Sequence, residues 1–159
     1  MIRELLGFSE GILQDLHHHH KEVWRLINRI RDSSDPSLRG FMFDEMKAKI
    51  IADSQAEEEV LYTRLAEHDD EEARDFVEES REIRSRVEKL LERLGGHADT
   101  LSEAWREDLE KLRQVVKQHI DEDESVGFSC ARRLFDKKEL AEIGGEFKRR
   151  REMLIIAAH

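Results

Sequence analysis

Apolar residues recur every three or four positions in five segments of the chain, a spacing typical of amphipathic helices. The first segment runs from about Ser9 to Arg31, and the others cover about residues 35–67, 69–94, 100–127 and 136–153. Because the first four segments are long and their connections are short, they should pack as antiparallel neighbours. The pattern predicts an all-α fold, an up-down-up-down four-helix bundle with a short C-terminal fifth helix, as one domain over residues 1–159.

Residues typical of helix ends lie between these segments. Asp35 and Pro36 combine a capping side chain with a residue favoured at the first helical position. Gly95-Gly96 is typical of a C-terminal stop. The segment 100–103, Thr-Leu-Ser-Glu, has the spacing of a capping box. Gly127 predicts that the fourth helix ends or bends there.

Each of the four long segments also places a polar residue on its apolar face, when residues are spaced at about 100° per step. A buried carboxylate without a partner costs several kcal/mol or takes up a proton, and no Arg or Lys lies at the centre of these faces to pair with one. With a rise of about 1.5 Å per residue, the polar positions fall in one layer of an antiparallel bundle. A chance gathering of polar residues at a loose bundle end is the alternative. The positions are His20, Asp53, Glu57, Ser80, His119 and Asp123.

The donor types in this layer suit a metal ion. The spacing of four residues within Asp53/Glu57 and within His119/Asp123 places each pair on one helical face. Imidazole and carboxylate donors without a thiolate favour iron or manganese over structural zinc, although imidazole also binds zinc. The Glu-x-x-His spacing of ferritin-like di-iron proteins does not occur in the sequence. The predicted metal ligands are His20, Asp53, Glu57, His119 and Asp123.

Composition and charge limit the classes of partner that we expect for this chain. The net charge is −10, and phosphate binding needs a basic face, so we expect no nucleic-acid partner; the basic run 148–151 is interpreted as a solvated helix face. The single cysteine, Cys130, fits a reducing cytosol. No apolar run approaches the ~20 residues that span a bilayer, and the N-terminus lacks the features of a signal peptide. The sequence predicts a cytoplasmic protein that binds no membrane.

Four segments in order resemble the hemerythrin-like, HHE cation-binding family, and the likeness covers nearly the whole chain. They are DLHHHHKEV at 15–23, SQAEEEVLY at 54–62, VEESREI at 77–83 and VKQHIDEDE at 116–124. The resemblance implies that His20 is the iron ligand of the first helix and Glu57 a bridging carboxylate. It also implies that His119 and Asp123 form the last ligand pair, with Asp in place of the commoner Glu.

Two positions depart from the family pattern, which has His where this chain has Asp53 and Ser80. Asp53 can bind metal through oxygen, whereas Ser80 is a poor ligand. Two His and three carboxylates make the site more anionic than the His-rich site of O2 carriers, which should favour O2 activation over reversible binding. One metal would be held weakly near Ser80 or lost, unless His17, Glu58 or Tyr62 replaces the missing ligand.

Three functions fit these residues. The first, which the resemblance implies, is a non-haem metal-binding protein that holds two iron ions, or else manganese or zinc, and binds or senses O2, NO or peroxide. The second is a carboxylate-rich di-iron or di-manganese oxidase or oxygenase, in which the gap at Ser80 admits O2 or substrate. The third is a metal-free, degenerate bundle that serves as an interaction scaffold.

Overall fold

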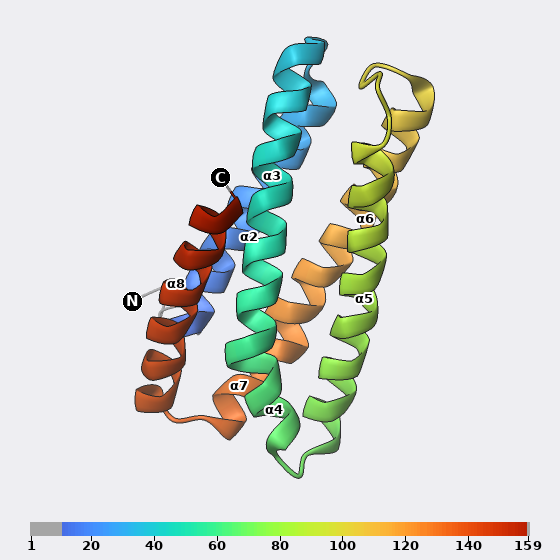
Figure 1. The fold of residues 1–159 in the computed structure, drawn as a ribbon. Helices are drawn as coiled ribbons and strands as arrows, with labels where there is room; N and C mark the ends of the chain where they lie inside the picture. The colour runs from blue at the N-terminus through green and yellow to red at the C-terminus, as the bar shows by residue number, and fades with distance from the viewer. Residues whose placement is uncertain (1–10, 159) are drawn as a thin grey trace.

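The computed structural model describes residues 11–158, and the expected helix start at Ser9 lies outside them. The fold is all-helical, as predicted. Its elements are α2 (Gly11–Asp32), α3 (Pro36–Glu57), η1 (Glu58–Tyr62), α4 (Thr63–Glu67), α5 (Glu71–Gly95), α6 (Glu103–Glu122), η2 (Asp123–Gly127), α7 (Phe128–Leu134) and α8 (Lys137–Ala158). The turns η1 and η2 are π-helical, so α3–η1–α4 and α6–η2–α7 form two continuous rods. Together with α2 and α5 these rods run up, down, up and down (Figure 1), which confirms the predicted bundle.

Several predicted helix ends are confirmed, and one is displaced. The Asp35 side chain accepts hydrogen bonds from the first backbone N–H groups of α3, and α5 ends at Gly95. The cap of α6 is Ser102, which accepts from the Trp105 N–H, so the capping box predicted at 100–103 was wrong by two residues. The reason is a turn before the helix, because Asp99 accepts the N–H groups of the two residues that precede Glu103.

The fourth helix does not end at Gly127. It passes through the π-helical turn η2 and continues as α7. A Cβ atom on Gly127 would lie 2.5 Å from the ring of Phe76 and 3.0 Å from the Asp123 carboxylate. The glycine therefore lets Phe76 of α5 pack against the turn. A π turn holds more residues than an α turn, so the faces beyond Asp123 are rotated relative to an unbroken helix.

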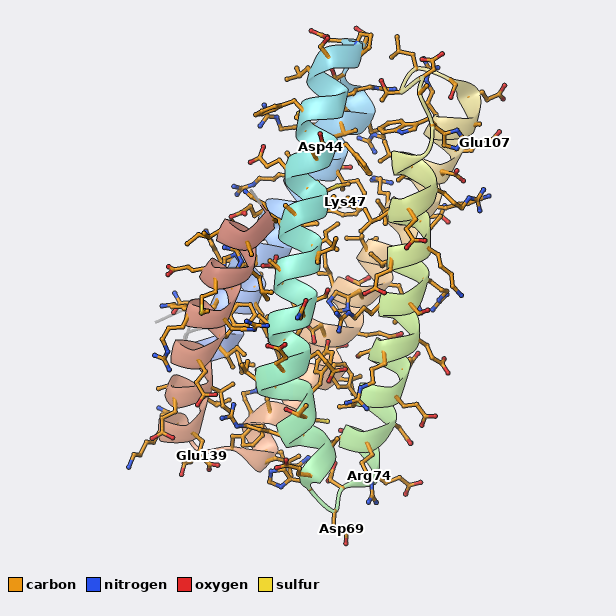
Figure 2. The ribbon with its side chains drawn as sticks, viewed as in Figure 1. Asp44, Lys47, Asp69, Arg74, Glu107 and Glu139 are labelled. Atoms are coloured by element: carbon orange, nitrogen blue, oxygen red, sulfur yellow. The ribbon has the colours of Figure 1, made fainter. Side chains whose placement is uncertain are left out.

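The buried apolar side chains form two clusters. One lies toward the α4–α5 connection and includes Phe76, Phe128 and Phe147. The other lies toward the α2–α3 and α5–α6 connections and includes Ile83 and Trp105. Charged side chains such as those of Asp44 and Glu107 point away from the bundle (Figure 2). Between the two clusters lies a layer of buried polar residues, His20, Glu57, Ser80 and Asp123.

The C-terminal helix α8 packs against α2 and α3 on the outside of the bundle (Figure 1). The approach to α2 is close, because a Cβ atom on Gly144 would lie 2.8 Å from the backbone nitrogen of Ile12. Arg150 of α8 reaches a carboxylate on η1 and Arg151 reaches one on α3, which brings α8 to the edge of the polar layer. Among residues 11–158, no helix is long and apolar enough to cross a membrane.

Candidate metal centre

Two imidazoles and two carboxylates converge in the polar layer. One donor atom from each of His20, Glu57, His119 and Asp123 lies within 4.8 Å of the other three. His20 comes from α2, Glu57 ends α3, His119 comes from α6 and Asp123 begins η2. Glu57 is 2% exposed and Asp123 1% exposed. The structure thus brings four of the five predicted ligand residues to one point, called here the central cluster.

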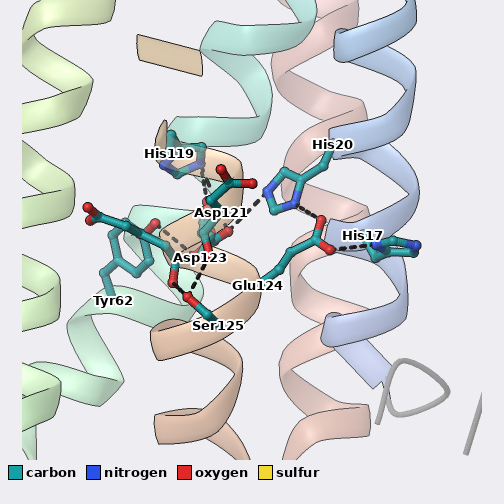
Figure 3. A network of polar contacts seen from close by, with 10 residues as sticks. His17, His20, Tyr62, His119, Asp121, Asp123, Glu124 and Ser125 are labelled. Atoms are coloured by element: carbon teal, nitrogen blue, oxygen red, sulfur yellow. Dashed lines mark hydrogen bonds and ion pairs between the residues drawn. The ribbon is translucent and has the colours of Figure 1, made fainter. Parts of the chain in front are cut away.

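Short contacts join the members of the central cluster. Nε2 of His20 lies 3.0 Å from Oδ2 of Asp123. Nε2 of His119 lies 3.7 Å from Oε1 of Glu57 and 3.9 Å from Oδ2 of Asp123. On the other side, the hydroxyl of Tyr62 donates to Oδ1 of Asp123 at 3.3 Å (Figure 3). Asp123 is therefore the central residue of the group, with a neighbour on each of its oxygens.

Glu124 fixes the orientation of His20 from outside the cluster. Its two oxygens lie 2.7 Å from Nδ1 of His20 and 2.7 Å from Nδ1 of His17 (Figure 3). A carboxylate that accepts the Nδ1 proton holds the imidazole as the tautomer whose Nε2 is free to bind. Sequence analysis did not assign Glu124 a role, because the rotation in η2 that turns it toward α2 leaves no signal in the apolar pattern.

Charge in the cluster is shared among coupled groups. Burial, and next the charge of Asp123, raise the pKa of Glu57 well above its usual range. Burial opposes ionisation of Asp123 as well, but its contacts with His20 and Glu57 hold its pKa below the usual value. Burial also lowers the pKa of His20, yet its contacts with Asp123 and Glu124 raise that pKa to about 9. The protons on these groups must leave when a cation binds.

Three donor atoms of the cluster lack a hydrogen bond of good geometry among the described residues. They are Nε2 of His20, Oε2 of Glu57 and Oδ2 of Asp123, all buried. Buried polar atoms in proteins almost always have a partner, so each exception calls for a physical cause. A cation at this point would give all three atoms a partner at once. Nitrogen and oxygen donors without sulfur fit iron, manganese or zinc.

Asp53, the fifth predicted ligand, lies outside the central cluster. Its carboxylate accepts a hydrogen bond and ion pair from Arg151 of α8. Sequence analysis found no cation for Asp53 because it compared only the faces of the four bundle helices. The partner comes from the fifth helix, whose docking against α3 no local pattern specifies.

The other residues named as possible ligands have different surroundings. Ser80 is 3% exposed and lies beside Tyr62, whose hydroxyl donates to Oδ1 of Asp123. Glu58 forms an ion pair with Arg81 at 2.7 Å near the surface. His17 contacts Glu124 rather than the cluster. Of the three substitutes for a missing ligand, only Tyr62 borders the cluster.

A cavity of about 70 Å³ borders the cluster and is lined by residues of α2, α3, α5 and α6. A single water needs roughly 10–15 Å³ of such volume, so the cavity admits a few small molecules. Its walls are mostly apolar, with the cluster residues His20, Glu57 and His119 on one side. The apolar part of the lining includes Leu16, Val23, Ile50, Ile83, Val87 and Val116.

Comparison with known proteins places the chain in a family. The model of the hemerythrin HHE cation binding domain matches residues 11–131. A DNA nickase from Nostoc sp. is 26% identical over 129 residues, which cover 81% of this chain and 36% of the relative. The chain thus spans about a third of that relative's length. No solved structure matches this chain significantly. Because the family match takes in all four bundle rods, this chain belongs to the hemerythrin HHE cation-binding domain family.

Proposed function

We propose that this chain is a non-haem iron protein that holds up to two ions at the central cluster and binds or senses O2, NO or peroxide. The observation that carries the proposal is the gathering at one point of three buried donor atoms that make no hydrogen bond of good geometry among the described residues. They belong to two carboxylates and an imidazole in a chain of a cation-binding family. Such mixed nitrogen and oxygen donors suit iron and manganese.

The donor set can serve two ions. Nε2 of His20 and Nε2 of His119 both approach Oδ2 of Asp123, at 3.0 and 3.9 Å (Figure 3), so both imidazoles lie beside a shared carboxylate and we expect each ion to take one of them. Glu57 and Asp123 have two oxygens each and would be shared between the ions. The side of Asp123 that faces Tyr62 has Ser80 where the family has His, so the ion on that side would be held more weakly.

The neighbouring residues prepare the site for a small ligand. Bound iron would supply the electrons that are shared with, or transferred to, such a ligand. Glu124 keeps Nε2 of His20 directed at the cluster, and the hydroxyl of Tyr62 donates a hydrogen bond to Oδ1 of Asp123. The apolar cavity limits water beside the cluster and leaves room for a small uncharged molecule. The same cavity supports the second candidate, an oxidase or oxygenase that acts on a small apolar substrate.

The relative named as a DNA nickase raises the question of a nucleic-acid partner. In this chain the basic run 148–151 is largely neutralised, because Arg150 pairs with Glu59 and Arg151 with Asp53. Paired arginines are less available to phosphates. These contacts, with the net charge of −10, support a small ligand rather than a nucleic acid as the partner.

The test is anaerobic titration of the metal-depleted chain with Fe(II), followed by NO and electron paramagnetic resonance. We expect one tightly bound iron, a second bound more weakly, and a new paramagnetic signal with NO. Asp121→Asn, an exposed change on α6, should behave as the unaltered protein. Absence of bound iron would refute the proposal. Irreversible consumption of O2 with formation of a product would favour the enzyme over the sensor.

A further inference from the structure

The last helix supplies a cation at the edge of the central cluster. Arg151 of α8 pairs with Asp53 of α3, and its Nη2 lies 3.5 Å from Glu22 of α2. Glu22 is also paired with Lys49 at 2.7 Å. The side chains of Arg151 and Asp53 are only 15% and 17% exposed. This ion pair is therefore far better shielded from water than a surface salt bridge.

Asp53 occupies a place from which a carboxylate could serve the cluster. It lies one helical turn before Glu57 on the same rod. It lines the same cavity as His20, Glu57 and His119. Its donor type matches Glu57 and Asp123. Instead, Asp53 pairs with Arg151, a residue that lies beyond the 11–131 segment matched by the family.

We propose that Arg151 withholds Asp53 from the metal, so that α8 sets the number of carboxylates at the centre. The inference rests on the proposed metal binding. An arginine keeps its charge at every physiological pH and holds a carboxylate in a fixed geometry. For Asp53 to join the cluster, the ion pair must break, leaving Arg151 mostly shielded from water with Glu22 as its remaining acidic partner. In this way α8 keeps the donor set at two imidazoles and two carboxylates.

The test is a double-mutant cycle on Mn(II) affinity, measured anaerobically by competition with a chelator. Oxygen donors are the ones that Mn(II) prefers. Arg151→Gln should tighten Mn(II) binding about tenfold, because affinity at oxygen sites rises with the number of charged ligands. The same substitution in the Asp53→Asn background should leave the affinity within about twofold. Asp53→Asn alone should leave the affinity unchanged.

Arg150→Gln is the matched control. Arg150 is the neighbouring arginine on α8 and pairs with Glu59 on the same rod as Asp53, but nearer the surface. The substitution removes the same charge and should not change Mn(II) affinity. Equal gains from Arg151→Gln in the Asp53 and Asn backgrounds would show only a long-range effect of charge and would overturn the inference. No gain, or weaker binding, would overturn it as well.

The inference can still be tested when Arg151→Gln misfolds, and its failure can be told apart from failure of the proposed function. If Arg151→Gln does not fold, Asp53→Asn alone decides: unchanged affinity supports the inference, and a tenfold loss shows that Asp53 already binds the metal. If the unaltered protein binds no metal, the proposed function fails and this inference fails with it. If the unaltered protein binds metal but none of these substitutions changes its affinity, only the role of Arg151 is refuted and the proposed function stands.

Discussion

At the end of the bundle where α2 meets α3, the buried Arg39 donates to three backbone carbonyls, those of Arg31, Ser33 and Thr100. At the centre, Glu57 and Asp123 are as deeply buried, yet one oxygen of each makes no hydrogen bond of good geometry among the described residues. Both regions contain buried charge. Only in the first does the buried charge have well-formed hydrogen bonds to several partners, which make burial tolerable without another molecule.

Asp108 extends the comparison to a carboxylate. It is 3% exposed, and its two oxygens lie 2.9 Å from Arg93 and 3.3 Å from His97. A buried acid with both oxygens paired is structural. Burial therefore does not by itself mark a functional residue, whereas several incompletely paired donor atoms gathered at one point indicate a binding site.

Glu57→Gln should have the largest effect. Loss of one partner from a buried charged group costs about 4 kcal/mol, which is about a thousandfold in metal affinity. The metal-depleted variant should be at least as stable as the metal-depleted parent, because a neutral amide replaces a buried acid. Metal titration and chemical denaturation in a chelator measure the two quantities. Unchanged metal affinity would show that Glu57 is not a ligand.

Arg39→Met should lower the stability of the fold without changing the affinity for metal. Three carbonyls would lose their donor, at an expected cost of about 3 kcal/mol in the free energy of unfolding. The loss should be the same with and without metal, since Arg39 lies far from the cluster along the bundle. Denaturation curves in both conditions test this, with the exposed Arg31→Met as control. A change in metal affinity would contradict the separation of the two regions.

Glu124→Gln should have a moderate effect. The amide can no longer accept from both imidazoles as a charged group, so the orientation of His20 is less well fixed. Loss of such an outer partner typically costs 10–100-fold in metal affinity. Asp121→Asn, three residues earlier and exposed, is the control. If Glu124→Gln binds as tightly as the parent protein, Glu124 does not position His20.

Asp70 should give the smallest effect, because it is a paired charge near the surface. Hydrogen bonds from Arg133, and next from the Ala73 N–H at the start of α5, lower the pKa of Asp70 from 3.8 to about 2. A lowered folded-state pKa contributes stability that is present above pH 3.8 and is lost as the pH falls toward 2.

Asp70→Asn should therefore lower the melting temperature at pH 7 by a few degrees, and the difference from the parent should shrink between about pH 4 and pH 2. Melting curves of the two proteins, both depleted of metal, measure this difference. A gap that stays constant over that range would show that the charge of Asp70 contributes nothing.

Local patterns predicted much of the fold. Asp35, Pro36 and Gly95 act within a few residues of their position, so their roles can be predicted without tertiary structure. The apolar period also placed His20, Glu57, His119 and Asp123 on inward faces, and the structure brings them together. The period holds over these residues because α2, α3 and α6 are regular α-helices up to the cluster.

The unpredicted features depend on contacts between distant segments. The contact of Glu124 with His20 follows the rotation in η2, and η2 depends on how Gly127 receives the ring of Phe76. The pairing of Asp53 depends on where α8 docks. Neither feature changes the spacing of apolar residues, so no reading of one segment at a time reveals it.

The most direct test of the account is the metal content of anaerobically purified protein, measured by elemental analysis beside Glu57→Gln. We expect the parent protein to retain iron or manganese through gel filtration, and Glu57→Gln, folded to the same helical content, to retain almost none. Equal metal content in the two proteins, or none in either after anaerobic iron loading, would contradict it.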